Sequence, residues 1–182
     1  MNIIQTEIEG LLIFEPRVFR DERGWFMESF NQKTFDEAVG EHYSFVQDNH
    51  SFSTQGVLRG MHYQLPPFAQ GKLVRVVQGK VWDVAVDIRK ASSTFGCYFG
   101  LELSAENQRQ LWVPPGFAHG FFTLSKTAEF LYKTTAFYDK SSERNILWND
   151  PDLKINWPDI GIDPVLAEKD AHAPLLKFSD TF

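Results

Sequence analysis

Short runs of alternating apolar and polar residues, each closed by turn residues, fill the middle of this 182-residue chain. From 72 to 88 the sequence reads KLVRVVQGKVWDVAVDI, which is two such runs on either side of Gly79. Because successive side chains of a strand point to opposite faces, this pattern predicts two strands joined as a β-hairpin. In the second strand one face would carry Trp82, Val84, Val86 and Ile88, and the other Asp83, Ala85 and Asp87. Similar runs, separated by short turns, lie at 97–103, 110–113, 120–124 and 128–135.

The number and spacing of these strands predict an all-β fold, either a sandwich or a barrel. Seventeen Phe residues fit this class, because aromatic side chains pack well on sheets. Only the segment 31–39 has helical spacing, with Phe35 and Val39 on one face. Proline-containing pairs along 149–182 predict an irregular C-terminal wrap with at most a short helix at 163–169. Since no linker or repeat interrupts the chain, we expect a single domain over 1–182.

The charge pattern argues against several classes of partner. The formal net charge is −6 and the Lys and Arg residues form no block, so neither a nucleic acid nor an anionic membrane is expected. No apolar run approaches the roughly 20 residues of a spanning helix, and the acidic segment 1–10 is unlike a signal peptide. We expect a soluble cytoplasmic protein. The single Cys97 has no disulfide partner in the chain, and we expect it to pack as a small apolar side chain.

Two short motifs indicate where chemistry would occur. The stretch GVLRGMHYQ at 56–64, followed by Lys72, has the spacing of the first cupin motif. The stretch PPGFAH at 114–119 matches the second motif. Both motifs occur in the order found in cupins, and this resemblance implies a cupin-type jelly-roll barrel.

The motif residues differ from those that hold a metal. A first-row metal in such a barrel needs three His and one carboxylate. Here Gln64 replaces a His and Lys72 replaces the acid, which leaves only His62 and His119. A lysine ammonium would lie where the charge of the metal belongs, so no metal site is expected. A histidine and a lysine in one apolar barrel suit proton transfer instead, because the imidazole accepts a proton and the ammonium stabilises the negative charge that develops.

Six longer segments carry a more specific resemblance. They read FRDERGWFMESF at 19–30, QDNHS at 47–51, LRGMHYQ at 58–64, QGKLVR at 70–75, VPPGFAHGF at 113–121 and EKD at 168–170. As a set they resemble the dTDP-4-dehydrorhamnose 3,5-epimerase family. The resemblance implies a cofactor-free, homodimeric isomerase that inverts C3 and C5 of a dTDP-linked 4-keto-6-deoxyhexose through an enolate.

The same resemblance assigns roles to individual residues. His62 would be the base, Asp170 would orient it, and Lys72 would face the enolate oxygen. Tyr132 would donate a proton to the opposite face of the sugar. The implied substrate-binding residues are Arg23, Arg59 and His119 at the diphosphate, Glu28, Gln47, Asp48 and Asn49 at the nucleoside, Tyr138 stacked on the base, and Phe26, Lys72, Glu143 and Lys169 as further contacts. Residues of the partner chain would complete each site.

The sequence leaves three other functions open. A mono-epimerase of the same fold would invert only C3 or C5, and the motifs do not separate it from the double epimerase. A metal-dependent cupin is disfavoured by Gln64 and Lys72. A non-catalytic jelly roll would bind the sugar nucleotide and exchange none of its hydrogens.

Overall fold

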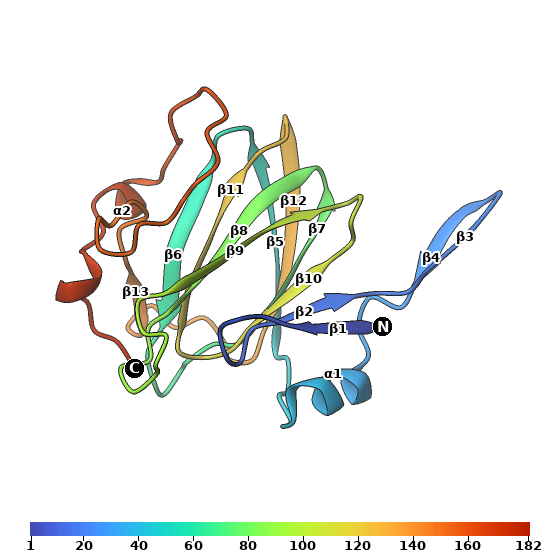
Figure 1. The fold of residues 1–182 in the computed structure, drawn as a ribbon, viewed down its shortest axis with the longest axis horizontal. Helices are drawn as coiled ribbons and strands as arrows, with labels where there is room; N and C mark the ends of the chain where they lie inside the picture. The colour runs from blue at the N-terminus through green and yellow to red at the C-terminus, as the bar shows by residue number, and fades with distance from the viewer.

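The computed structural model describes residues 1–182 and shows two antiparallel sheets that face each other in a jelly-roll barrel (Figure 1). The six-stranded sheet runs in the order β1 (Asn2–Gln5), β2 (Leu12–Glu15), β10 (Gln110–Val113), β7 (Lys72–Gln78), β12 (Thr127–Thr134) and β5 (Gln47–Thr54). The five-stranded sheet runs in the order β13 (Glu143–Asn145), β6 (Leu58–Gln64), β11 (Phe117–Thr123), β8 (Lys80–Asp87) and β9 (Tyr98–Ser104). A separate hairpin of β3 (Val18–Asp21) and β4 (Gly24–Met27) projects from the barrel. The predicted all-β jelly roll is therefore confirmed.

The hairpin predicted over 72–88 is wrong, although both of its strands exist. β7 pairs with β10 and β12 in one sheet, whereas β8 pairs with β11 and β9 in the other. The chain crosses between the sheets at Gly79, whose φ is +72° and where a Cβ would lie 2.0 Å from the carbonyl oxygen of Thr127. The two strands thus contribute to one core from opposite sheets, with Val76 from β7 and Val81 from β8 both buried in it. Alternation identifies strands but does not identify their partners.

Both faces of the five-stranded sheet are covered. Its inner face contributes Ala85 to the core between the sheets. The outer face carries Val84, Val86 and Ile88, which pack against Ile146 and Leu153 of the C-terminal segment in a second apolar cluster. The predicted apolar face of β8 is therefore its outer face, and the C-terminal wrap covers it.

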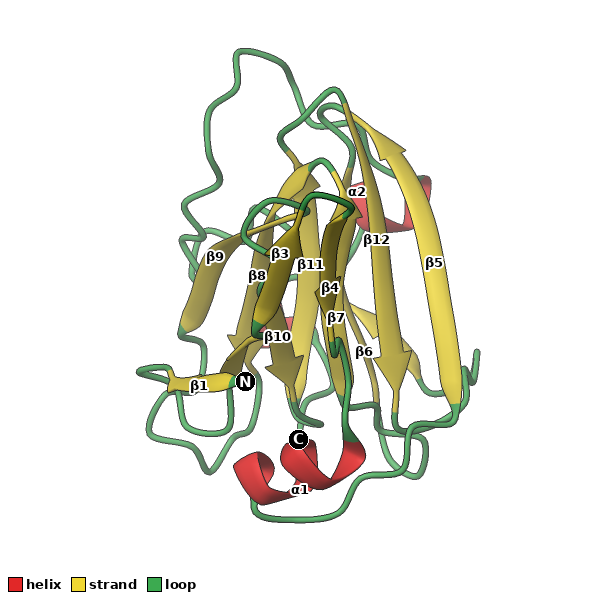
Figure 2. Ribbon diagram, turned by 90° about the vertical axis from the view of Figure 1, so that its right-hand side faces the viewer, coloured by secondary structure: helices red, strands yellow, loops and turns green.

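One end of the six-stranded sheet is covered by α1 (Gln32–Val39). Asn31 caps this helix by accepting a hydrogen bond from the Thr34 N–H, and Gly40 ends it in the left-handed conformation. Phe35 is 2% exposed and its ring centroid lies 4.9 Å from that of Trp112, so the predicted helix is anchored through its apolar face. Figure 2 shows α1 below the sheets and β5 at the open edge of the six-stranded sheet.

The other local predictions are mostly confirmed. Strands β9 to β12 lie within a few residues of the predicted runs. The C-terminal segment is irregular apart from α2 (Glu168–Ala171) and a single 3₁₀ turn at Leu176–Phe178, so the short helix begins later than predicted. Cys97 does not pack in the core but is exposed, because it lies in the turn before β9. No helix has the length and apolar character needed to span a membrane.

Candidate active site

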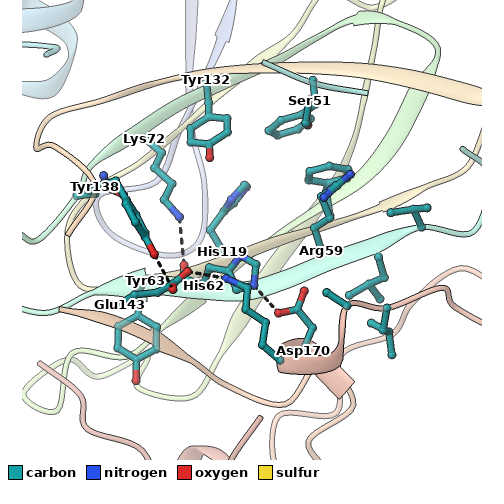
Figure 3. Close-up of a pocket in the computed structure, with 18 of the residues that line it drawn as sticks. Ser51, Arg59, His62, Tyr63, Lys72, His119, Tyr132, Tyr138, Glu143 and Asp170 are labelled. Carbon is teal, nitrogen blue, oxygen red and sulfur yellow. Dashed lines mark hydrogen bonds and ion pairs between the residues drawn. The ribbon is translucent and has the colours of Figure 1, made fainter. Parts of the chain in front are cut away.

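A cavity of about 440 Å³ opens between the two sheets, and side chains from both sheets and from the C-terminal segment line it (Figure 3). Its apolar wall includes Phe121 and Phe130, whose rings stack with centroids 4.3 Å apart. The predicted site residues that line it are Arg59, His62, Lys72, His119, Tyr132, Tyr138, Glu143, Lys169 and Asp170. The barrel thus brings together residues from β6, β7, β11, β12, β13 and α2.

His62 and Asp170 form a hydrogen-bonded dyad in the wall of the cavity. Nε2 of His62 lies 2.6 Å from Oδ1 of Asp170, a carboxylate whose residue is only 1% exposed. The Gly60 N–H donates to the other carboxylate oxygen at 3.3 Å, and the Asn145 amide donates to Oδ1 at 3.3 Å. With Nε2 donating to the carboxylate, Nδ1 is left as the nitrogen that accepts a proton.

The surroundings keep this imidazole neutral. Burial lowers the pKa of His62 below its ordinary value, and the neighbouring Lys72 ammonium acts in the same direction. Asp170 opposes this effect by favouring the imidazolium. At neutral pH His62 is therefore an unprotonated base whose protonated form has a carboxylate ready to stabilise it.

Lys72 is the buried cation of the site. It is 8% exposed, and its Nζ donates to the backbone carbonyl of His62 at 3.1 Å. Burial lowers the pKa of the Lys72 ammonium to about 8, while the charges of Asp83 and Glu143 partly oppose the shift. The ammonium is protonated at neutral pH and lies beside the base, where it can stabilise an oxyanion.

Tyr132 comes from the wall opposite His62. It lies on β12 of the six-stranded sheet, whereas His62 lies on β6 of the five-stranded sheet, and its phenol points into the cavity (Figure 3). Burial raises the pKa of Tyr132, so its hydroxyl keeps its proton at neutral pH. A proton acceptor and a proton donor therefore face each other across the space available to a ligand.

His119 forms a second buried pair, with Asp83. Its Nε2 lies 3.0 Å from both carboxylate oxygens of Asp83, and the two residues are 7% and 0% exposed. His119 is also the register partner of His62 between β11 and β6. Sequence reasoning did not identify Asp83, because alternation placed it opposite the apolar face of its strand, and the structure shows that this opposite face is the inner one.

The rim of the cavity carries a hydrogen-bonded group of three residues. The Tyr138 hydroxyl donates to Oε2 of Glu143 at 3.1 Å, and Nζ of Lys169 lies 2.6 Å from Oε1 of the same carboxylate. Tyr138 is 54% exposed, so one face of its ring is available to a flat ligand.

The residues at the cupin metal positions do not form a ligand set. No three His, Cys, Asp or Glu side chains lie together in an arrangement that could hold a metal ion. Gln64 is turned to backbone groups rather than to the two histidines, and Lys72 brings a positive charge.

Comparison with known proteins assigns the family. A family model described as dTDP-4-dehydrorhamnose 3,5-epimerase matches residues 5–177. This chain belongs to the dTDP-4-dehydrorhamnose 3,5-epimerase family. It is 63% identical over 182 residues to the dTDP-4-dehydrorhamnose 3,5-epimerase of Shigella flexneri, covering 100% of this chain and 99% of that protein.

Solved structures of the epimerase family have the same fold. The dTDP-6-deoxy-D-glucose-3,5-epimerase from Legionella pneumophila, in complex with dTDP-4-keto-L-rhamnose, is 53% identical with a TM-score of 0.94, covering 98% of this chain and 94% of that one. A 3'-monoepimerase from Streptomyces bikiniensis, in complex with dTDP-quinovose, is 35% identical with a TM-score of 0.89, covering 94% and 86%. The fold is thus shared by family relatives described as double and as single epimerases.

Of the remaining predicted contacts on β5 and β6, Arg59 lines the cavity, whereas Gln47, Asp48 and Asn49 do not. Arg59 donates from Nε to Ser53 Oγ at 3.1 Å and lines the cavity. Oε1 of Gln47 accepts the Tyr138 N–H at 3.0 Å, while its amide donates to Asn49. Asp48 points away and pairs with Lys133 at 2.9 Å.

Three further predicted contacts do not line the cavity of one chain either. Arg23, Phe26 and Glu28 belong to the projecting β3–β4 hairpin or follow it directly, and none lines the cavity. Arg23 instead pairs with Asp21 on the exposed hairpin, and Phe26 is 70% exposed.

Proposed function

We propose that this protein is a dTDP-4-dehydrorhamnose 3,5-epimerase, a single-domain isomerase that converts dTDP-4-dehydro-6-deoxy-D-glucose to dTDP-4-dehydro-L-rhamnose in dTDP-L-rhamnose biosynthesis. The observation that carries this proposal is the arrangement of His62 and Tyr132 on opposite walls of one cavity, with Lys72 beside the base. Inversion needs a proton acceptor on one face of a carbon and a proton donor on the other, and the cavity offers both. Family membership supports the substrate class.

The chemistry follows from the ketone at C4 of the sugar. Removal of the hydrogen on C3 or C5 leaves the C–H electron pair delocalised onto the C4 oxygen as an enolate. Nδ1 of His62 takes the proton, Asp170 stabilises the imidazolium, and the Lys72 ammonium stabilises the enolate oxygen. The Tyr132 hydroxyl then protonates the carbon from the other face. Solvent afterwards takes the proton from His62 and returns one to Tyr132.

The nucleotide half of the substrate would occupy the rim. Arg59 and His119 offer positive or donor groups to the diphosphate, and an arginine fork suits phosphate oxygens. The exposed ring of Tyr138 would stack on thymine, with Glu143 and Lys169 beside it. Gln47 and Asn49 lie on the strand that leads to this rim and would contact the nucleoside, whereas Asp48 points away from the cavity and is not given this role.

We further propose a homodimer in which the β3–β4 hairpin of each chain completes the site of the other with Arg23, Phe26 and Glu28. An isolated two-stranded hairpin is marginally stable in water, yet this one exposes Phe19, Trp25 and Phe26 at 51%, 55% and 70%. Strand β5 is an open edge of the six-stranded sheet and exposes Phe52 at 56%. Edge strands with apolar side chains are sites where a second chain docks. A cytoplasmic location stays a prediction from the sequence.

The second candidate is a mono-epimerase, because a relative described as a 3'-monoepimerase shares the fold at TM-score 0.89. Sequence identity favours the double epimerase, at 63% against 35% for that relative. Proton NMR of the 4-keto sugar nucleotide in heavy water, incubated with the protein, separates the two. Loss of the signals at both C3 and C5, with appearance of the L-rhamno product, is the expected result. Exchange at one carbon alone would establish the mono-epimerase, and binding of dTDP without any exchange would refute catalysis.

A further inference from the structure

Gln64 occupies a metal-ligand position of the cupin motif, yet its side chain serves a different purpose. It lies at the end of β6, two residues beyond His62, and is 4% exposed. Nε2 donates to the carbonyl oxygens of Phe68 and Phe137 at 2.6 and 3.1 Å. Oε1 accepts the Asp139 N–H at 2.8 Å. Two donors and one acceptor of the carboxamide are thus used by three backbone groups.

Two of these three hydrogen bonds flank Tyr138. The carbonyl of Phe137 precedes it and the N–H of Asp139 follows it, so a single buried amide holds the backbone on both sides of this tyrosine. Tyr138 itself is 54% exposed and Phe137 is 63% exposed, so packing alone does little to fix this loop. Polar groups therefore do most to hold this loop in place. The Gln64 carboxamide is the central one, and it lies on β6, the strand that also carries His62.

The chemistry of the side chain explains why a carboxamide is required. A neutral imidazole offers one donor and one acceptor, and a carboxylate offers no donor at all. Neither the histidine of a metal-binding cupin nor a glutamate can therefore satisfy two carbonyls and one N–H together. Replacement of the metal ligand by Gln64 exchanges a metal contact for control of the neighbouring loop.

We propose that Gln64 is a positioning residue that holds Tyr138 in place for stacking on the nucleobase. It thereby sets the affinity for the nucleoside half of the substrate and takes no part in proton transfer. This inference rests on the proposed function, because it assumes that a nucleobase lies on Tyr138.

The test separates nucleotide binding from chemistry. Gln64→Glu keeps an acceptor for Asp139 and removes both donors. We expect the Kd for dTDP, measured by calorimetry, to rise about ten-fold. A loss of this size lies within the range that one base–aromatic stack usually contributes to affinity. The Kd for inorganic pyrophosphate, which has no base, should not change. In Gln64→Met, which adds no charge to the cavity, deuterium exchange into substrate at saturation should stay within about two-fold of wild type, with an unchanged pH profile. Gln64→Met, which has similar length and no charge, carries the same expectations if the glutamate substitution does not fold.

Two controls identify the route of the effect. Gln55→Glu makes the same change at an exposed glutamine that donates to the Leu124 carbonyl, and it should leave both affinities unchanged. In a double-mutant cycle with Tyr138→Ala, the double variant should bind dTDP no more weakly than the single variant with the lower affinity. Both substitutions remove the same interaction, the stacking of Tyr138 on the nucleobase. Additive losses, an equal loss of pyrophosphate affinity, or a fall in exchange at saturation with normal dTDP affinity would each overturn the role of Gln64. Failure of the wild-type protein to bind dTDP would overturn the proposed function itself.

Discussion

Nε2 of His62 lies 2.6 Å from Oδ1 of Asp170, although 108 positions separate the two residues in the chain. His62 is part of the barrel, whereas Asp170 arrives on the C-terminal segment through the short helix α2. This segment is joined to the barrel by a parallel bridge between Val57 and Val165. The His62–Asp170 pair therefore forms only when the C-terminal segment is docked on the barrel.

Removal of either member of this dyad should abolish the chemistry while nucleotide binding persists. We expect His62→Ala to reduce deuterium exchange at C3 and C5 together by at least about 10²-fold, because in the proposed mechanism one base serves both carbons. Asp170→Asn should be milder but still severe, since the amide no longer stabilises the imidazolium. Calorimetry should show dTDP affinity close to that of wild type. His42→Ala, which removes an exposed histidine paired with Asp36, is the matched control; exchange at either carbon near the wild-type rate in His62→Ala would show that His62 is not the common base.

The pH profile should be bell-shaped, with each limb set by one group. The pKa of His62 is lowered by burial, so the base stays unprotonated to below its ordinary value near pH 6.5 and activity falls only under more acidic conditions. The Lys72 ammonium has a pKa of about 8, so activity should decline as pH rises through that value and the cation is lost. Measurement of kcat/KM from pH 5 to 10 tests both limbs. In Lys72→Arg the alkaline limb should move to higher pH, whatever the loss in kcat; an unmoved limb would assign it to another group.

The sequence predicted the strands of this barrel better than their pairing. Runs at 97–135 alternate strongly and became β9 to β12. Strand β5 reads QDNHSFST, and no strand was predicted there. All of its side chains except Phe52 are polar, so both faces of the strand are polar and show no alternation. Pairing of β7 with β8 failed as a prediction because it depends on which strands lie next to each other across the barrel, and local alternation carries no such information.

Residues of the candidate site were predictable from the sequence where they belong to a recognised motif. His62, Lys72 and His119 came from the cupin spacing, and the structure brings all three to one cavity. Asp83 was missed because both faces of β8 are covered, so alternation could not show that its side chain points inward. The role of Gln64 was also hidden, since its three backbone partners follow it by 4 to 75 positions.

Metal independence is expected from the residues at the ligand positions. Dialysis against a chelator should leave the epimerase rate unchanged, and recovery of activity only after addition of a divalent ion would contradict this. Lys72→Glu restores the acid of the cupin motif and places an anion beside the developing enolate, so exchange should be lost by at least about 10²-fold. Circular dichroism and dTDP binding should confirm that the variant folds.

The proposed assembly of each site from two chains predicts complementation. Arg23 lies on the projecting hairpin and His62 lies in the barrel, so Arg23→Ala and His62→Ala would damage different contributions to a shared site. In a hybrid dimer both lesions would fall in one site and the other would be intact. Mixing the two inactive proteins under conditions of subunit exchange should therefore restore up to about half of the activity per hybrid dimer. Persistent inactivity after exchange has been verified by mass spectrometry of tagged chains would indicate that each site is built from one chain.

Tyr132 tests the two-face mechanism most directly. Because it faces His62 from the opposite sheet, Tyr132→Phe should remove the proton donor and leave the base intact. The enolate would still form beside Lys72 and be quenched from the side of His62, so deuterium should enter at C3 or C5 with little inverted product. Fold and dTDP affinity should change modestly, because Phe keeps most of the packed volume.

Two measurements on this variant, deuterium content by mass spectrometry and stereochemistry by proton NMR, distinguish the possible roles of the phenol. Deuterium exchange with retained configuration is expected from a mechanism with one base and a separate acid. Epimerisation at the wild-type rate would show that water or another group supplies the proton. Loss of exchange as complete as in His62→Ala would mean that the phenol is needed for deprotonation itself, as a hydrogen-bond donor to the enolate oxygen. In that case the acid and the oxyanion stabiliser would have to be reassigned between Tyr132 and Lys72.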